Sequence, residues 1–243
     1  MQLDQRETGY TYRAWTTPLR RSALPNATLR VTGAAAGPRV AYQGEPGAFG
    51  EAAIAQHWGG AAVAVGVTTF AGVLRLLLAR AVDAAVLPAW NSTIGPIGGV
   101  QELLYEHAAY AEVVGEVSVN VHHALVALPG ASLASVRAVG SHPAALGQCE
   151  RYLGSLPGVT AHVAFDTAGA ARELAALVGA APRGLGSPWY AHVRDAAPET
   201  LAAIASESAA ERHGLVVLAR YVQDDPDNET RFVVLRRRAG MRS

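Results

Sequence analysis

The sequence contains no lysine, and all twenty of its basic residues are arginine. Without lysine the chain cannot form a Schiff base, anchor pyridoxal phosphate or build a Walker-type phosphate loop. Cys149 is the single cysteine, which excludes an intrachain disulfide and a cysteine-rich zinc site. Acidic residues also number twenty, so the basic excess of a nucleic-acid or anionic-membrane binder is absent. We therefore expect neither nucleic acid nor membrane among the partners, and no metal.

A long uninterrupted apolar run is also missing. The first thirty residues carry several charged side chains and no apolar stretch, so we expect no export signal. The most apolar stretch, residues 61–89, is interrupted by Arg75, Arg80 and Asp83, which argues against a membrane span. We expect a cytoplasmic protein.

Half of the 243 residues are hydrophobic, which is enough for a sizeable core. Residues 1–37 show no strong period and are interpreted as an N-terminal extension. From residue 38 onward, segments typical of strands and helices alternate, which predicts an α/β fold with a parallel sheet. Expected strands are 39–42, 62–67, 84–87, 111–128, 136–140, 159–165, 215–222 and 232–236. Expected helices are 49–58, 69–81, 95–108, 144–153, 167–178 and 202–213, with a long loop or insertion at 179–199.

Polar residues recur where an expected strand leads into a helix. The glycine-rich turn 44–49, with Gly47 and Ala48, either holds an anion on its backbone amides or is simply a tight turn. Asn91, Ser92 and Thr93 are either helix caps or neutral donors to a carboxylate.

Further along the chain, Ser141-His142 and Thr167 occupy similar turns. His142 is the best-placed proton donor, because an imidazole titrates near neutral pH. His122 and His123 are neighbours on an expected strand and face opposite sides, so they are interpreted as packing or surface residues.

The last expected strand begins with a Thr-Arg pair. Arg231 can hold a carboxylate through two parallel bonds, and Thr230 offers a hydroxyl donor. In isolation such a pair is usually a cross-strand surface pair. Taken with the neutral donors of the strand-to-helix turns, it predicts a site for a small dicarboxylate.

Seven segments of the chain, in order over residues 38–237, resemble the prephenate dehydratase family. They are Ala41–Phe49, Pro88–Gly95, Gly115–Val117, Ser141–Cys149, Thr167–Ala171, the motifs within Ala203–Leu215, and Asn228–Phe232.

The resemblance implies a two-lobed fold like that of type II periplasmic binding proteins, with mixed sheets, flanking helices and a ligand cleft between the lobes. The expected lobes are residues 38–112 plus 223–237, and 113–222. It also implies a carbon–oxygen lyase that converts prephenate to phenylpyruvate in phenylalanine biosynthesis, needs no cofactor and forms a homodimer or higher homo-oligomer. Thr230 and His142 are the expected catalytic residues. The expected substrate-binding residues are Arg231, Phe232, Asn91, Ser92, Trp90, Ser141, Thr167, Gly47 and Ala48.

The chain departs from the family at Trp90, where the family has glutamate before Asn-Ser. An indole there changes the site volume and removes a possible proton carrier, so His142 is expected to take that role. The residue 179–199 segment is longer than usual, and the regulatory ACT domain that follows in most members is not expected in this chain. Two alternatives stay open. One is a non-aromatising prephenate decarboxylase of specialised metabolism, favoured by Trp90 but not by the intact Thr230-Arg231-Phe232 motif. The other is an inactive prephenate-binding relative.

Overall fold

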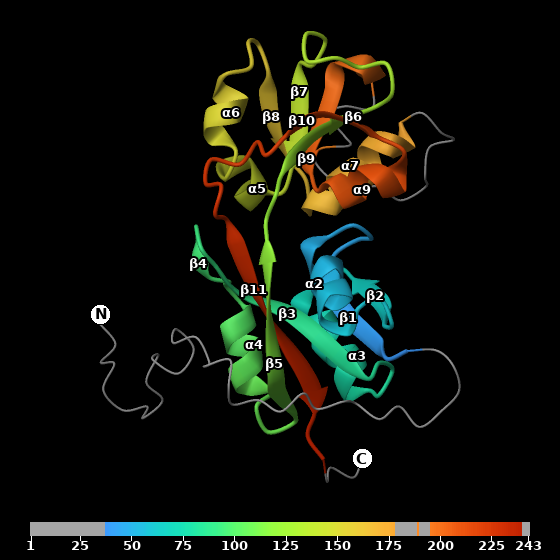
Figure 1. Ribbon diagram of the computed structural model, residues 1–243, viewed down its shortest axis with the longest axis vertical. Coiled ribbons are helices and arrows are strands. Elements are labelled where there is room, and N and C mark those ends of the chain that lie inside the picture. The colour runs from blue at the N-terminus through green and yellow to red at the C-terminus, as the bar shows by residue number, and fades with distance from the viewer. Residues whose placement is uncertain (1–36, 178–188, 190–194, 240–243) are drawn as a thin grey trace, which may run out of the picture. The chain divides into compact units, whose positions relative to one another are not determined.

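The computed structural model describes residues 37–177, Trp189 and residues 195–239. The expected extension, apart from Gly37, and most of the expected 179–199 insertion lie outside the described residues. Within this part of the chain, strands and helices form two mixed sheets, each covered by helices on both faces (Figure 1).

The first sheet has the strand order β2-β1-β3-β11-β5, with β4 paired to β3. β1, β2 and β3 are parallel, whereas β11 runs antiparallel to both β3 and β5. The chain therefore leaves this sheet after β5 and returns to it as β11. The strands are β1 (Arg39–Gln43), β2 (Val63–Val67), β3 (Ala84–Asn91), β4 (Gly95–Pro96), β5 (Ala111–Asn120) and β11 (Glu229–Arg237).

Alternation along the strands divides the core of this sheet between its two faces. α2 (Phe49–Trp58) packs on the face that carries Val86 and Phe232. α3 (Phe70–Leu78) and α4 (Val100–Glu106) pack on the face that carries Leu87 and Val233. The Thr69 hydroxyl accepts a hydrogen bond from the Gly72 amide at 3.0 Å and so caps α3.

The second sheet has the order β10-β6-β9-β7-β8, in which β7 is parallel to both of its neighbours. α7 and α9 cover one face, and α5 and α6 cover the other. The strands are β6 (Ala124–Ala127), β7 (Ala138–Ser141), β8 (Thr160–Val163), β9 (Leu201–Ala205) and β10 (Val216–Arg220). The helices are α5 (Pro143–Gly147), α6 (Glu150–Gly154), α7 (Thr167–Ala176), the short 3₁₀ helix at Pro198–Thr200 and α9 (Glu207–His213).

The prediction of an α/β fold with two mixed, helix-covered sheets is confirmed. The expected lobe boundary near residue 113 is wrong. Nine of the ten residues of β5 pair with β11, and a register shift leaves out Val114. β5 therefore belongs to the first sheet, and the chain crosses to the second sheet after Asn120.

The expected helix over 202–213 is also wrong in its first part. Residues 201–205 form β9, in which all five residues are buried between β6 and β7. A strand buried on both faces shows no polar alternation, so its alanine-rich sequence looked helical. The helix begins only at Glu207, where the Ser206 hydroxyl accepts from the Ala209 amide at 3.0 Å.

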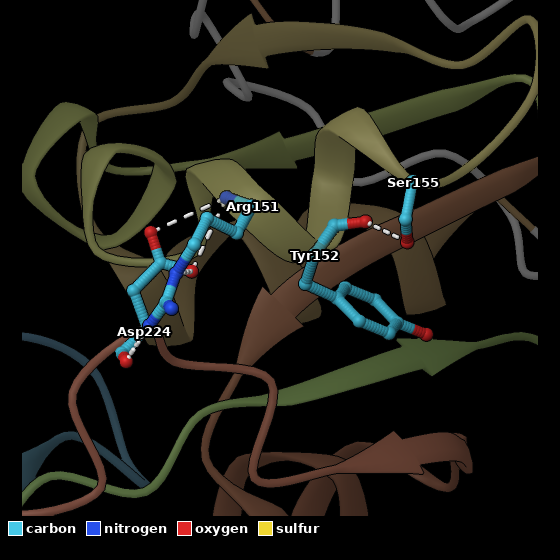
Figure 2. A network of polar contacts seen from close by, with 4 residues as sticks. All are labelled: Arg151, Tyr152, Ser155 and Asp224. Atoms are coloured by element: carbon cyan, nitrogen blue, oxygen red, sulfur yellow. Dashed lines mark hydrogen bonds and ion pairs between the residues drawn. The ribbon is translucent and has the colours of Figure 1, made fainter.

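The single helix expected over 144–153 is interrupted at Cys149, which separates α5 from α6. α6 begins against the segment that returns to the first sheet. The Arg151 amide donates to both carboxylate oxygens of Asp224 at 3.2 Å, and the Arg151 guanidinium donates to the Asp224 carbonyl (Figure 2). The Asp224 amide donates in turn to the Gln148 carbonyl at 2.6 Å. Asp224 therefore joins the returning segment to the junction between the two helices.

Among the described residues, none of the helices is both long and apolar enough to cross a bilayer.

Candidate active site

A cavity of about 640 Å³ is lined by residues from both sheets. Its lining includes the residues that follow strands, namely Gly44 after β1, Thr68 after β2, His142 after β7, Asp166 after β8 and Ser206 after β9. The cavity therefore lies at the carboxyl ends of these strands, which is the usual ligand position in α/β folds.

Thr230 lines this cavity at the start of β11, and its side chain is buried in a cluster of amides. Asn91, at the end of the neighbouring β3, donates from Nδ2 to the Thr230 hydroxyl oxygen at 2.9 Å and to Asn228 Oδ1 at 2.7 Å. Because the Thr230 oxygen already accepts a bond, its own proton is available to a group in the cavity. The structure therefore brings Thr230 and Asn91, both predicted site residues, together at this cavity.

Arg231 and Trp90 lie on the opposite face of the sheet. Thr230 and Phe232 both line the cavity, so the residue between them points away from it. A bulge at Ala89 shifts the register, so that Trp90 lies opposite Arg231 while Asn91 lies opposite Thr230. The Arg231 guanidinium carbon is 4.2 Å from the centroid of a Trp90 ring. The expectations that Arg231 holds a carboxylate in the cleft and that Trp90 borders it are not supported.

Trp90→Leu should therefore affect stability rather than turnover. A cation–π contact at a partly exposed site contributes about 0.5–1 kcal/mol, which corresponds to about 1–4 °C in Tm for a domain of this size. We expect a Tm shift of that order, with kcat within about twofold of wild type, measured by thermal unfolding and steady-state kinetics. A kcat loss of tenfold or more at a near-native Tm would place Trp90 in the catalytic machinery.

His142 lines the cavity as the N-cap of α5, where its Nδ1 accepts a hydrogen bond from the Ala144 amide at 3.2 Å. Burial around the ring lowers the pKa of His142 below its usual 6.5, and the Asp166 carboxylate opposes that shift only in part. A neutral ring that accepts at Nδ1 carries its proton on Nε2. The geometry therefore favours neutral His142 as a hydrogen-bond donor, and the expectation that a cationic His142 supplies a proton is not supported.

In the described part of the chain, four histidines each have a pKa below the usual 6.5, and for each the largest cause is burial. The unfolded chain binds protons on them near pH 6.5, whereas the folded chain does so only at lower pH. Between these values the unfolded state binds more protons, so stability rises with pH. We expect the free energy of unfolding, from urea titrations, to fall as pH decreases from 7 to about 5.5. These residues are His57, His123, His142 and His213.

His57, which lies outside the cavity lining, provides the control for this pH dependence. The variant His57→Leu should show a smaller loss of stability between pH 7 and 5.5 than wild type. Equal stability of the wild-type protein at both pH values would contradict the prediction.

The remaining predicted site residues divide into two groups. Gly47, Ala48 and Thr167 line the cavity together with Phe232, and their role in substrate binding stays a prediction. Ser141 is fully buried and donates to the Ile204 carbonyl at 2.8 Å, which is a bond between strands of the second sheet. Ser92 is exposed and accepts a hydrogen bond from the Glu229 amide. Neither serine belongs to the cavity lining, so the structure gives them structural contacts.

Gln148 and His123 line the cavity, although neither is among the residues that the sequence predicts for the site. Gln148 Nε2 donates to the Thr93 hydroxyl at 2.8 Å and lies 3.3 Å from Asn91 Oδ1, so it reaches from the end of α5 to the end of β3. His123 lies between β5 and β6 rather than within a strand, and its side chain is 2% exposed. The alternation argument did not apply to it, because the backbone at 121–123 is not extended into a sheet.

The charge of the cavity lining is low. Among the described lining residues, Asp166 is the one carboxylate and no arginine is present. Asp166 caps α7 by accepting from the Gly169 amide at 2.6 Å. Binding of an anion here therefore depends on neutral side chains and on backbone amides, such as those of Phe49 and Gly50 in the first turn of α2.

Comparison with known proteins identifies the family. Residues 40–240 match the family described as prephenate dehydratase. The chain belongs to this family.

Plant and bacterial proteins are both found among the relatives of this chain. Arogenate dehydratase 1 from Petunia hybrida is 40% identical over 200 residues, which cover 82% of this chain and 42% of the plant protein. A prephenate dehydratase from Arthrobacter aurescens, solved in complex with L-Phe, has a TM-score of 0.67 and 28% identity over 84% of this chain and 62% of that one. A structure named GqqA and described as a quorum quenching acylase has a TM-score of 0.66 and 32% identity, covering 84% of this chain and 66% of its own. The chain spans less than half the length of the curated relatives it matches.

Proposed function

We propose that this prephenate dehydratase family chain converts prephenate to phenylpyruvate, with loss of carbon dioxide and water. The observation that carries the proposal is the Thr230 hydroxyl, which lies in the cavity and accepts a bond from Asn91 Nδ2. This arrangement leaves one hydroxyl proton free for a leaving oxygen on the substrate.

The chemistry asks little of the protein beyond positioning. In prephenate, the bond between the ring and its carboxylate breaks, and its electron pair moves into the ring. The bond to the ring hydroxyl breaks in turn, and the hydroxide leaves as water after gaining a proton. Aromatisation drives the reaction, so the site must orient the ring and assist departure of the hydroxide. Thr230 supports that departure by hydrogen bonding, because its high pKa makes it a poor proton source by itself.

Arogenate is a second candidate substrate, and the charge of the cavity favours it. Arogenate carries an α-ammonium group where prephenate has a keto group. Among the described lining residues Asp166 supplies a carboxylate and no cationic side chain is present. This lining suits arogenate, whose ammonium offsets one of its two carboxylates, better than prephenate, whose two negative charges have no such offset. Dehydration and decarboxylation of arogenate would yield phenylalanine.

The non-aromatising alternative loses the observation that favoured it. Trp90 was the reason to expect loss of assistance to the leaving group, and it lies against Arg231 rather than in the cavity. Thr230 and Asn91, in contrast, are both in place.

Incubating the purified chain separately with prephenate and with arogenate tests the proposal. Product masses distinguish phenylpyruvate, phenylalanine, a dihydro-hydroxyphenylpyruvate and unchanged substrate. We expect phenylpyruvate from prephenate, and a higher kcat/KM for arogenate if Asp166 contacts the ammonium. Asp166→Asn is the matched variant, since it keeps a capping oxygen for α7 and removes the charge. Unchanged prephenate and arogenate would contradict the dehydratase proposal.

The homo-oligomer, the cytoplasmic location and the absence of a cofactor stay predictions. Light scattering of the eluted protein measures the first, and activity after exhaustive dialysis against a chelator measures the last.

A further inference from the structure

His123 lies on the first segment that connects the two sheets, directly before β6. Its side chain is 2% exposed, lines the cavity and meets the Phe49 ring edge-on at a centroid distance of 5.6 Å. Its amide donates to Gln223 Oε1 at 3.0 Å, and its carbonyl accepts from the Val222 amide on the second connecting segment. The backbone of His123 is therefore held between the two connections.

The ring of His123 makes one polar contact within the described part of the chain, from Nε2 to Gln148 Oε1 at 2.9 Å. Burial lowers the pKa of His123, so the ring is neutral near pH 7 and donates from one nitrogen. An amide oxygen can only accept, so this contact requires the tautomer with the proton on Nε2. Nδ1 is left as an acceptor without a partner among the described residues.

This bond also determines which end of the Gln148 amide faces Asn91. With Oε1 held by His123, the Nε2 group of Gln148 points at the Thr93 hydroxyl and at Asn91 Oδ1. The reverse orientation would set the Gln148 oxygen against Asn91 Oδ1, and the Thr93 hydroxyl already donates to that oxygen at 2.6 Å.

Asn91 in turn is oriented by what its oxygen accepts. Oδ1 accepts from the Thr93 hydroxyl, from the Thr93 amide at 3.0 Å and from the Ile94 amide at 3.3 Å. Gln148 adds a fourth donor from the end of α5. These bonds leave Nδ2 as the end that faces the Thr230 hydroxyl. A continuous chain of hydrogen bonds thus runs from His123 through Gln148 and Asn91 to Thr230.

We propose that His123 is a positioning residue, which holds the Gln148 amide so that Asn91 presents Nδ2 to the Thr230 hydroxyl. The inference rests on the proposed function, because it assigns Thr230 the assistance of the leaving group. A phenyl or leucyl side chain would fill the same space without a buried ring nitrogen that lacks a partner. Packing alone therefore does not account for a histidine here, and the hydrogen bond from its ring to Gln148 does.

Two substitutions separate this role from packing. His123→Phe keeps a planar ring against Phe49 and removes the donor, and it should lower kcat by about 10- to 100-fold with little change in KM, as for other partners that orient a functional group. His123→Gln restores a donor near the position of Nε2 and should recover most of that loss. His122→Phe is the matched control, because the exposed His122 contacts Tyr221 and Gln223 instead and should keep wild-type kcat.

A double-mutant cycle with Gln148→Leu shows whether His123 acts through Gln148. In the Gln148→Leu background, His123→Phe should cause no further loss of kcat, because the contact is already gone. Losses that multiply across the cycle, or wild-type kcat in His123→Phe, would overturn the proposal.

The resting protein offers a test that needs no turnover. In ¹⁵N-histidine-labelled protein, the His123 ring should show the neutral tautomer protonated at Nε2, and its shifts should change in Gln148→Leu. A proton on Nδ1 would overturn the proposal whatever the kinetics show. Absence of turnover in the wild-type protein, with the Nε2 tautomer present, would instead contradict the proposed function.

Discussion

Replacing Thr230 with alanine is expected to lower kcat by about 10²–10⁴-fold, the range for a positioned group that assists proton transfer. The hydroxyl oxygen accepts from Asn91 Nδ2 at 2.9 Å, so its own proton is available to a group in the cavity. The effect should fall on kcat more than on KM, because the bond to the leaving oxygen strengthens as charge develops in the transition state. Steady-state kinetics with prephenate and arogenate, followed through product formation, provide the measurement.

Thr230→Ser is the matched control for this prediction. It keeps a hydroxyl within reach of Asn91 and removes one methyl group, so it should retain most of the wild-type kcat. If Thr230→Ala turns over at the wild-type rate while its Tm is unchanged, Thr230 does not assist the leaving group. If serine is as inactive as alanine, packing of the threonine methyl rather than hydrogen bonding would explain the loss.

Replacing Trp189 with alanine is expected to destabilise the protein by about 3–5 kcal/mol, as for other fully buried large aromatic residues. The side chain is 0% exposed within the core cluster that α7 and α9 form with the second sheet. A Cβ atom added at Gly140 would lie 2.3 Å from the indole, which shows how closely the ring packs on β7. The loss is a large part of the about 5–15 kcal/mol that stabilises a typical protein. Urea unfolding gives the free energy directly.

Trp189→Phe isolates the volume of the indole from its polarity. Nε1 of Trp189 has no hydrogen-bond partner among the described residues, so phenylalanine removes an unpaired donor while it keeps one ring. We expect it to cost less than half as much as alanine. An alanine variant as stable as wild type would mean that the indole contributes little to this core.

The second core explains why one indole should matter so much. Much of this cluster consists of alanine, including Ala168, Ala171, Ala203 and Ala209, so the helices approach the sheet closely and each contact buries little area. The sequence showed the alanine-rich pattern but not its consequence. Alanine favours helices intrinsically, and this preference concealed β9 between two neighbouring strands. Only the tertiary pairing of residues 201–205 identifies them as a strand.

The sequence predicted the cavity better than it predicted the direction of individual side chains. Thr230, Asn91 and Thr167 were expected in or near the site because they stand at the ends of strands, and strand ends meet in space. The sequence predicts Arg231 and Trp90 there as well, because they are neighbours of Thr230 and Asn91 along the chain, although neighbours on a strand point to opposite faces. Strand alternation alone predicts that Arg231 points away from the cavity. The direction of Trp90, in contrast, depends on the bulge at Ala89, which arises from the pairing of two strands far apart in sequence. No local pattern reveals it.

The two cavity residues that the sequence does not predict both lie just beyond the end of a helix or strand. Gln148 enters the site because α5 ends at residue 147, and His123 because the chain leaves β5 at Asn120. Both boundaries were placed wrongly from the sequence, since a helix over 144–153 and a strand over 111–128 would have carried these side chains elsewhere. Helix and strand ends are set by contacts with the rest of the fold, here by Asp224 at the start of α6.

The bulge at Ala89 has a practical consequence for redesign of this protein. Because of the bulge, the consecutive residues Trp90 and Asn91 make unrelated contacts. Trp90 packs against the Arg231 guanidinium on the sheet face away from the cavity, whereas Asn91 donates to the Thr230 hydroxyl in the cavity. A saturation library at position 90 can therefore be screened for solubility and heat tolerance with the chemistry held constant, whereas a library at position 91 samples the reaction itself. Alignments that treat the two positions as one motif would merge two independent choices.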